Sequence, residues 1–144
     1  MKAQMETRKE KIYAVIDLKS FYASVECADR RLDIFKTPLV VADKERTQNT
    51  IVMSVTPFLK QRYGVPNVCR LRDVPNVEGL IYATPRMARY IEVSANVVSI
   101  LLDFVAEEDL HVYSIDESFI RIDPYLMAAN ATPEEFCNKY SRFF

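Results

Sequence analysis

The chain has 144 residues and 49% of them are hydrophobic, so it is long and apolar enough to form one folded domain rather than a disordered segment. Nineteen basic residues face twenty acidic ones, which excludes a strongly basic surface that would bind nucleic acid by charge alone. A single histidine argues against a histidine-based metal site or catalytic triad, and two glycines exclude the glycine-rich loops that bind phosphates.

The sequence carries no membrane or export signal. No apolar run reaches the roughly 18 residues of a membrane-spanning helix. Residues 1–11 alternate in charge and lack the apolar core of a signal peptide, so we predict a mobile leader there. Cys27, Cys69 and Cys137 lie far apart with no metal-binding spacing, which predicts free thiols in a reducing, cytoplasmic setting.

The first predicted strand covers residues 12–18, a short apolar run interrupted by one carboxylate, Asp17. A helix is predicted to follow at once, with Ser20 as its N-cap. Its apolar positions follow helical spacing: Phe21, Val25, Ala28 and Leu32. Asp17 is therefore expected where a strand ends and a helix is about to start.

Two further strands are predicted over residues 37–43 and 50–55. A helix follows the second of them, because Thr56 is a good cap and Pro57 suits the first helical position. Gly64 is expected to end this helix in the left-handed conformation.

A brief extended segment over residues 80–83 leads into the longest predicted helix, which again begins with a Thr–Pro pair, Thr84 and Pro85. Its apolar residues recur in steps of three and four and form one predicted stripe: Met87, Ile91, Ala95, Val98, Leu102 and Val105. Acidic residues over 107–109 oppose the helix dipole and end it.

A hairpin is predicted next, with strands over residues 110–115 and 118–122. Asp123 and Pro124 are expected to break it. The residues 132–135 form a capping box and start a final helix, which is predicted to run to the last residue, Phe144. Without a C-cap there, we expect the chain to have been cut short at this point.

Carboxylates mark the ends of two predicted strands: Asp17 in the first, and Asp116 with Glu117 in the hairpin turn. If these strands lie side by side, the three carboxylates meet at one end of a sheet, where oxygen ligands suit Mg²⁺. Such a layout is typical of two-metal phosphoryl transfer. On spacing alone, a polar turn is the simpler interpretation, because acidic turns are common.

Two motifs resemble those of a known family. The segment from Asp17 to Glu26, DLKSFYASVE, resembles the opening motif of Y-family translesion DNA polymerases, and Tyr113 to Phe119, YSIDESF, resembles their second catalytic motif. The order and separation of the motifs match, as does the small strand-and-helix unit between them. The resemblance covers nearly the whole chain from Ile12 on.

This resemblance implies an α/β (α+β) fold with a partial polymerase palm, in which helices pack on a mixed or antiparallel sheet. The palm would comprise residues 12–26 and 79–144, and a small fingers subdomain residues 27–78. The thumb and little finger would be absent. The chain would then be the N-terminal palm-and-fingers fragment of a DNA-directed DNA polymerase for translesion synthesis and DNA repair, and inactive alone.

By the same resemblance, Asp17, Asp116 and Glu117 would be catalytic, metal-binding carboxylates, with the Leu18 carbonyl as a further ligand. They would hold two Mg²⁺ ions together with the incoming deoxynucleoside triphosphate (dNTP). Primer–template DNA would be the partner in the full-length context, and a sliding clamp is a candidate partner.

Tyr22 would be the steric gate, whose ring occupies the space of a ribose 2′-hydroxyl. Phe21 and Lys60 would also belong to the nucleotide site, although core packing for Phe21 and a solvated helix face for Lys60 stay open from the pattern alone. The sequence departs from the family at Phe58 and Gln61, where many members carry a phosphate-binding Tyr and Arg.

Two other classes stay open at this stage. One is a non-catalytic remnant or binding module with the same fold. The other is a further palm-type enzyme such as a nucleotide cyclase, against which the Tyr22 gate and the inserted fingers-like unit argue.

Overall fold

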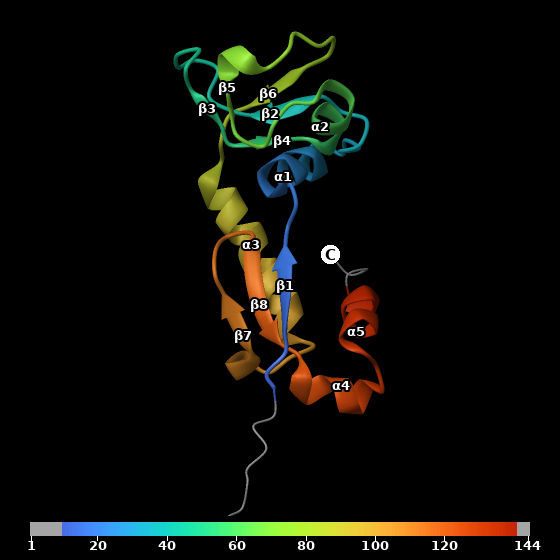
Figure 1. Ribbon diagram of the computed structural model, residues 1–144. Coiled ribbons are helices and arrows are strands. Elements are labelled where there is room, and N and C mark those ends of the chain that lie inside the picture. Colours follow the sequence, from blue (N-terminus) through green and yellow to red (C-terminus); the bar gives the residue numbers. More distant parts are fainter. Residues whose placement is uncertain (1–9, 141–144) are drawn as a thin grey trace, which may run out of the picture. The chain divides into compact units, whose positions relative to one another are not determined.

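The computed structural model describes residues 10–140 and shows two compact units (Figure 1). Unit 1 combines the chain up to Asp17 with the chain from Val97 on, and unit 2 runs from Leu18 to Asn96. The predicted leader falls almost entirely outside the described residues, as does the predicted end of the last helix. These units reflect packing and do not test the predicted palm and fingers boundaries, which stay predictions.

Unit 1 is built on a three-stranded antiparallel sheet in the order β1-β8-β7 (Figure 1). The strands are β1 (Tyr13–Asp17), β7 (Leu110–Val112) and β8 (Glu117–Arg121). The turn between β7 and β8 is closed by two backbone N–H groups, those of Tyr113 and Ser114, which donate to the Glu117 carbonyl at 3.0 Å each. The predicted first strand and hairpin are thus confirmed.

Side chains of β1 alternate between the two faces of this sheet, as period-two geometry requires. Tyr13 and Val15 are 55% and 56% exposed, whereas Ala14 and Ile16 pack into the core of unit 1. Buried residues from the helices and strands complete that core: Leu101, Val105, Ile120, Ile122 and Phe136. One face of the sheet is therefore covered by core, and the other carries exposed side chains.

Two helices follow the sheet in unit 1. The hairpin ends before Asp123 and Pro124, as predicted, but these residues also begin a helix that was not predicted, α4 (Asp123–Ala129), because proline is well tolerated in a first helical turn. The capping box before α5 (Pro133–Tyr140) is confirmed: the N–H of Thr132 donates to Glu135 Oε2 at 2.9 Å, and the N–H of Glu135 donates to Thr132 Oγ1 at 3.2 Å.

Helix α3 (Met87–Leu102) begins in unit 2 and ends in unit 1, and its predicted apolar stripe is wrong. Met87 and Ile91 on that stripe are 43% and 56% exposed, whereas Tyr90, Ser94 and Leu101 are the buried residues of the helix. The sequence of α3 is apolar on several faces, so helical spacing alone does not identify the buried one.

Unit 2 contains a sheet in the order β4-β2-β6 and a separate two-stranded sheet (Figure 1). Central β2 (Leu39–Val41) pairs antiparallel with β4 (Ser54–Val55) and parallel with β6 (Ile81–Ala83). The second sheet pairs β3 (Ile51–Val52) with β5 (Cys69–Arg70), which sequence reasoning missed. The strand predicted over residues 50–55 is thus divided between two sheets.

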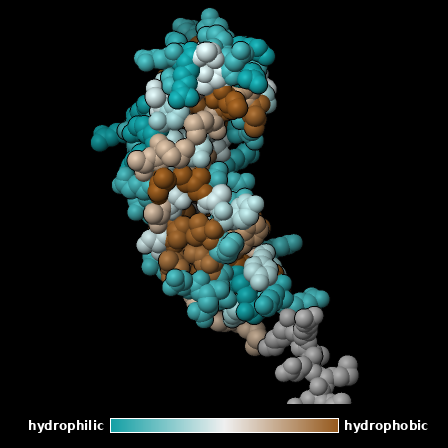
Figure 2. Space-filling model, turned by 90° about the vertical axis from the view of Figure 1, so that its left-hand side faces the viewer, coloured by the Kyte–Doolittle hydropathy of each residue, from teal (hydrophilic) through white to brown (hydrophobic). Residues whose placement is uncertain are grey.

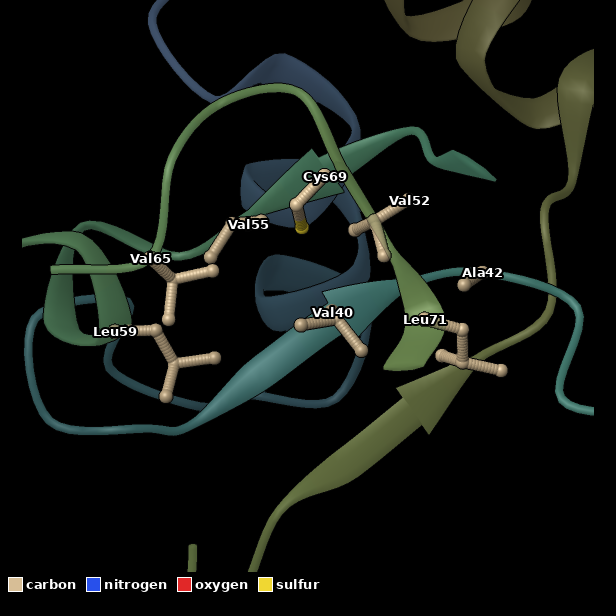
Figure 3. Close-up of a cluster of buried hydrophobic side chains, with 8 residues drawn as sticks. All are labelled: Val40, Ala42, Val52, Val55, Leu59, Val65, Cys69 and Leu71. Carbon is tan, nitrogen blue, oxygen red and sulfur yellow. The ribbon is translucent and has the colours of Figure 1, made fainter. Parts of the chain in front are cut away.

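Helices α1 (Phe21–Asp29) and α2 (Pro57–Tyr63) complete unit 2 together with a short 3₁₀ turn (Leu71–Asp73). Figure 3 shows side chains from β2 to β5 and from α2 meeting in one core: Val40, Ala42, Val52, Val55, Leu59, Val65, Cys69 and Leu71. The stripe predicted for α1 is wrong at its end, because Ala28 is exposed and the helix ends before Leu32.

Both predicted caps of these helices occupy the N-cap position, but neither side chain makes a capping hydrogen bond. The hydroxyl of Thr56 instead donates to the Thr37 carbonyl at 2.9 Å and accepts from the Leu39 N–H at 3.3 Å. The hydroxyl of Ser20 accepts a hydrogen bond from Lys60. Tertiary partners have thus replaced the local cap.

Gly64 ends α2 with φ at 65°, as predicted, and an added Cβ would meet nothing within 4 Å. We expect Gly64→Ala to destabilise unit 2 by about 1 kcal/mol, because an L-residue is strained in the left-handed region. Urea unfolding measures the effect, with Gln61→Ala on the exposed face of the same helix as the control. A Gly64→Ala protein as stable as its parent would contradict the assigned conformation.

Large hydrophobic side chains also reach the surface of both units, and Figure 2 shows such hydrophobic patches between hydrophilic ones on one face. Among the most exposed are Tyr113 at 66% and Val68 at 77%. Within residues 10–140, no helix has both the length and the apolar character that crossing a bilayer requires.

Candidate active site

Asp17 and Glu117 lie directly opposite each other where β1 ends and β8 begins. Residues opposite each other in an antiparallel ladder project from the same face, with Cβ atoms about 4.5–5.5 Å apart. The expectation that the first strand and the hairpin lie side by side is confirmed. Two of the three predicted carboxylates therefore share one face at one end of the sheet.

Asp116 precedes β8 and lies in the hairpin turn, where its Oδ1 accepts a hydrogen bond from the Ser114 hydroxyl at 3.0 Å. Asp17 is exposed, whereas Asp116 and Glu117 are half-buried. Among residues 10–140, no three His, Cys, Asp or Glu side chains are gathered closely enough to hold a metal ion. The convergence of all three carboxylates stays a prediction.

The negative charges of Asp17 and Glu117 favour a bound cation between them. Like charges directly opposite each other in a sheet destabilise it, by roughly 0.2–1 kcal/mol. Within the described part of the chain, Asp17, Asp116 and Glu117 form no ion pair that would offset this repulsion. Their donor set consists of carboxylate oxygens, which are the ligands that Mg²⁺ prefers. The residues present thus fit a hard divalent cation.

In unit 2, Tyr22 lies in the first turn of α1 and is half-buried. Its ring lies 4.7 Å, centroid to centroid, from the ring of Tyr90, with 31° between the planes. The neighbouring Phe21 is only 6% exposed and belongs to the core. The two neighbouring aromatic residues thus differ in exposure: Phe21 packs in the core, and Tyr22 is partly accessible.

Lys60 lies on α2 and is half-buried. Its Nζ donates to Ser20 Oγ at 2.7 Å. Ser20 has a φ of 55°, which is unusual for a residue other than glycine, and immediately precedes α1. Lys60 is therefore tied to the turn of the first motif rather than standing on a fully solvated helix face. The Leu18 carbonyl follows Asp17 directly, and its role as a ligand stays a prediction.

Sequence reasoning missed a charged cluster around Glu26, whose side chain is fully buried on α1. Glu26 accepts hydrogen bonds from Arg86 at 2.9 and 3.0 Å and from the Tyr90 hydroxyl at 2.7 Å, and it pairs with Arg30. One signal was available: Glu26 lies between Val25 and Cys27, both buried. A carboxylate there needs partners elsewhere in the fold.

An outer layer of charge surrounds this cluster. Asp29 accepts from Arg86 at 2.8 Å and from Arg89 at 2.8 and 3.1 Å. Both arginines are partly exposed, yet each is held in an ion pair. The hydrogen bonds from Arg89 and Arg86 lower the pKa of Asp29 to about 2.

The same contacts set the charge of the buried groups. Burial by itself raises the pKa of Glu26, but hydrogen bonds from Arg86, Tyr90 and Arg30 outweigh it and leave that pKa below its usual value. Burial, with the Glu26 carboxylate as acceptor, raises the pKa of Tyr90 to about 12. Glu26 is therefore ionised and Tyr90 is a neutral donor at neutral pH.

Comparison with known proteins places these features in a family context. A model of the impB/mucB/samB family matches residues 16–142, which include Asp17 at the end of β1, the whole of β8 and the whole of unit 2. The chain is 34% identical over 116 residues to UvrX of Bacillus subtilis, whose name refers to UV-damage repair; the match covers 78% of this chain and 28% of UvrX.

Two further relatives come from the same organism. DNA polymerase IV 2 is 35% identical over 115 residues, which cover 79% of this chain and 27% of the polymerase. The DNA repair protein homolog YozK is 33% identical over 101 residues, which cover 70% of this chain and 88% of YozK. The chain thus spans little more than a quarter of the two longer relatives and most of the short one.

A solved structure supports the fold. The chain is similar to the "Y-family DNA polymerase chimera Dbh-Dpo4(243-245)-Dbh", with a TM-score of 0.70 and 19% sequence identity. The likeness covers 90% of this chain and 37% of the chimera. The expected α/β arrangement of a Y-family palm and fingers is therefore confirmed as a fold.

Proposed function

The chain belongs to the impB/mucB/samB family of Y-family DNA polymerases, and on this premise we propose that it carries the metal-binding carboxylates and the nucleotide-selecting tyrosine of a DNA-directed DNA polymerase. The proposed activity is nucleotidyl transfer during translesion synthesis and DNA repair. The names of UvrX and DNA polymerase IV 2, which refer to UV-damage repair and DNA synthesis, support this choice.

The observation that carries the proposal is the placement of Asp17 opposite Glu117, with Asp116 in the adjoining turn. In the proposed site these carboxylates, with the Leu18 carbonyl, would hold two Mg²⁺ ions together with the dNTP. Such ions neutralise charge on the phosphates and align the attacking and leaving oxygens. The protein would contribute ligands of matched charge, two of which, Asp17 and Glu117, are placed opposite each other by the ladder between β1 and β8.

Residues of unit 2 would select and hold the nucleotide. The ring of Tyr22 is proposed to fill the space next to the sugar, because steric exclusion rejects an added hydroxyl more strongly than a loose apolar pocket does. Lys60 is proposed to contact the triphosphate, exchanging its bond to Ser20 for a phosphate oxygen. Phe21 supports the site from the core.

The partners are proposed from the family and from charge. Primer–template DNA and dNTP are the substrates, and a sliding clamp is a candidate partner. The net charge of −1 gives this chain little electrostatic attraction for duplex DNA. We also propose the cytoplasm as the location, which suits the free thiols.

Cation binding tests the proposed site on the chain itself. We expect Mn²⁺, used as a paramagnetic substitute for Mg²⁺, to broaden the amide signals of residues 17, 116 and 117 before those of other residues. Asp17→Asn should weaken this binding by at least about tenfold, because it removes a charged ligand. Two-dimensional nuclear magnetic resonance (NMR) spectroscopy measures both effects.

The matched control is Glu108→Gln, which removes one exposed carboxylate of unit 1 elsewhere. It should leave the broadening unchanged. Broadening centred on other acidic residues, or equal in the parent and in Asp17→Asn, would contradict the proposed metal site.

A second candidate function is a non-catalytic binding module with the same fold. It is favoured by the absence, within residues 10–140, of any three side chains already gathered around a metal position. This candidate predicts that Mn²⁺ does not localise at the sheet end even when dNTP is added. The titration above, repeated with dNTP, therefore separates the two candidates.

A further inference from the structure

Three side chains of unit 2 form a continuous line of contacts from the surface to the interior. The ring of Tyr22 contacts the ring of Tyr90, and the Tyr90 hydroxyl donates to Glu26. The two rings are tilted by 31° to each other, with their centroids 4.7 Å apart. This is within the range of favourable aromatic pairs, so the orientation of the Tyr22 ring depends on where the Tyr90 ring lies.

Tyr90 itself has little freedom. It is fully buried in α3, and its hydroxyl donates to Glu26 Oε1 at 2.7 Å. A bond to an ionised acceptor is stronger than one between neutral groups. Packing fixes the plane of the Tyr90 ring, and the hydroxyl fixes its far end.

Glu26 is in turn held by two arginines. Arg86 binds both of its carboxylate oxygens in a bidentate pair, and Arg30 binds Oε2 from the following turn of α1. Arg86 also reaches Asp29, so its guanidinium is fixed by two carboxylates. The Glu26 carboxylate is therefore a rigid acceptor that links α1 to the first turns of α3.

We propose that Glu26 is a positioning residue for Tyr22: acting through the Tyr90 hydroxyl, it fixes the plane of the Tyr22 ring. A gate that excludes a 2′-hydroxyl by its bulk must not rotate or retreat, so the same contacts would set the preference for deoxynucleotides. The preference for deoxynucleotides rests on the proposed function. The dependence of the Tyr22 ring orientation on Glu26 does not rest on it.

The mechanical link is tested on the chain without any ligand. Tyrosine ring signals are followed by NMR, with those of Tyr22 assigned by their loss in Tyr22→Phe. Tyr90→Phe keeps the ring but removes the hydroxyl, and Glu26→Gln keeps the shape but removes the charge. Both should make the Tyr22 ring flip about fivefold faster, the effect of losing roughly one hydrogen bond, and weaken the cross-peaks between rings 22 and 90.

Tyr63→Phe is the matched control, because it removes the hydroxyl of a partly exposed tyrosine whose ring contacts Phe58 instead. It should leave Tyr22 unchanged. Circular dichroism confirms that each variant is folded. Folded Tyr90→Phe and Glu26→Gln proteins in which Tyr22 flips at the parent rate would overturn the inference.

A second measurement tests the preference for deoxyribose over ribose. The ratio of dNTP affinity to ribonucleotide affinity, measured with Mg²⁺ by titration, should fall about two- to fivefold in Tyr90→Phe. In Tyr22→Ala the ratio should fall to about one. A parent chain that binds both sugars equally would contradict the proposed gate while the ring measurements still decide the link. An altered ring rate with an unaltered ratio would limit Glu26 to a role in packing and overturn its part in selectivity.

Discussion

Replacing Glu26 with alanine is expected to destabilise unit 2 by about 3 kcal/mol. The substitution leaves the Tyr90 hydroxyl buried without its acceptor and opens a cavity in a fully buried position. Arg86 and Arg30 limit the loss, because their side chains are 44% and 37% exposed and can turn to water. The estimate is therefore at the lower end of the range for breaking a buried ion pair.

Urea unfolding followed by the amide signals of residues 18–96 measures this effect. With a slope of about 2 kcal/mol per molar urea, the midpoint should fall by roughly 1.5 M. Asp29→Ala is the matched control: it also removes a carboxylate bound by two arginines, but one that is 24% exposed, so its loss should not exceed about 1 kcal/mol. Equal losses in the two variants would refute a special role for the buried carboxylate.

The elements that could be predicted are those that carry a local signal. The first strand is a short apolar run, and the hairpin turn carries adjacent acids between apolar segments. Gly64 ends α2 because glycine adopts its positive φ without steric strain, and the Thr132–Glu135 box begins α5 through bonds within four residues. In each case the deciding interaction lies within a few residues along the chain.

The features that could not be predicted depend on partners far along the chain. Tyr90 lies on the buried face of α3, where Glu26, sixty-four residues earlier, provides an acceptor for its hydroxyl. Met53 separates two strands whose partners, β2 and β5, belong to different sheets. Spacing within one helix or strand contains no information about such distant partners.

The candidate site divides in the same way. The pairing of Asp17 with Glu117 follows from two strands that could be predicted and from the register that their apolar residues impose. Asp116 lies in a turn, where the geometry follows from Ser114 and the backbone rather than from strand alternation. The predicted gathering of all three carboxylates would need the cation itself, since their mutual repulsion opposes it.

The largest effect is expected for catalysis by a chimera in which this chain replaces the matching segment of Bacillus subtilis DNA polymerase IV 2. The chimera should extend a primer with Mg²⁺ and dNTP, whereas the 144-residue chain alone should not, because its balanced charge gives it little hold on duplex DNA. Glu117→Gln in the chimera should lower the extension rate by on the order of a thousandfold, since it removes charge that stabilises the transition state through the ions.

Stability separates this loss from unfolding. Because Asp17 and Glu117 repel each other across the ladder, Glu117→Gln should stabilise unit 1 by about 0.5 kcal/mol in the absence of divalent cations. Activity and stability are thus expected to change in opposite directions, as they do where a site holds like charges together for a ligand. Glu108→Gln should change neither. Primer extension by the Glu117→Gln chimera at the parent rate would contradict the proposed catalytic role of Glu117.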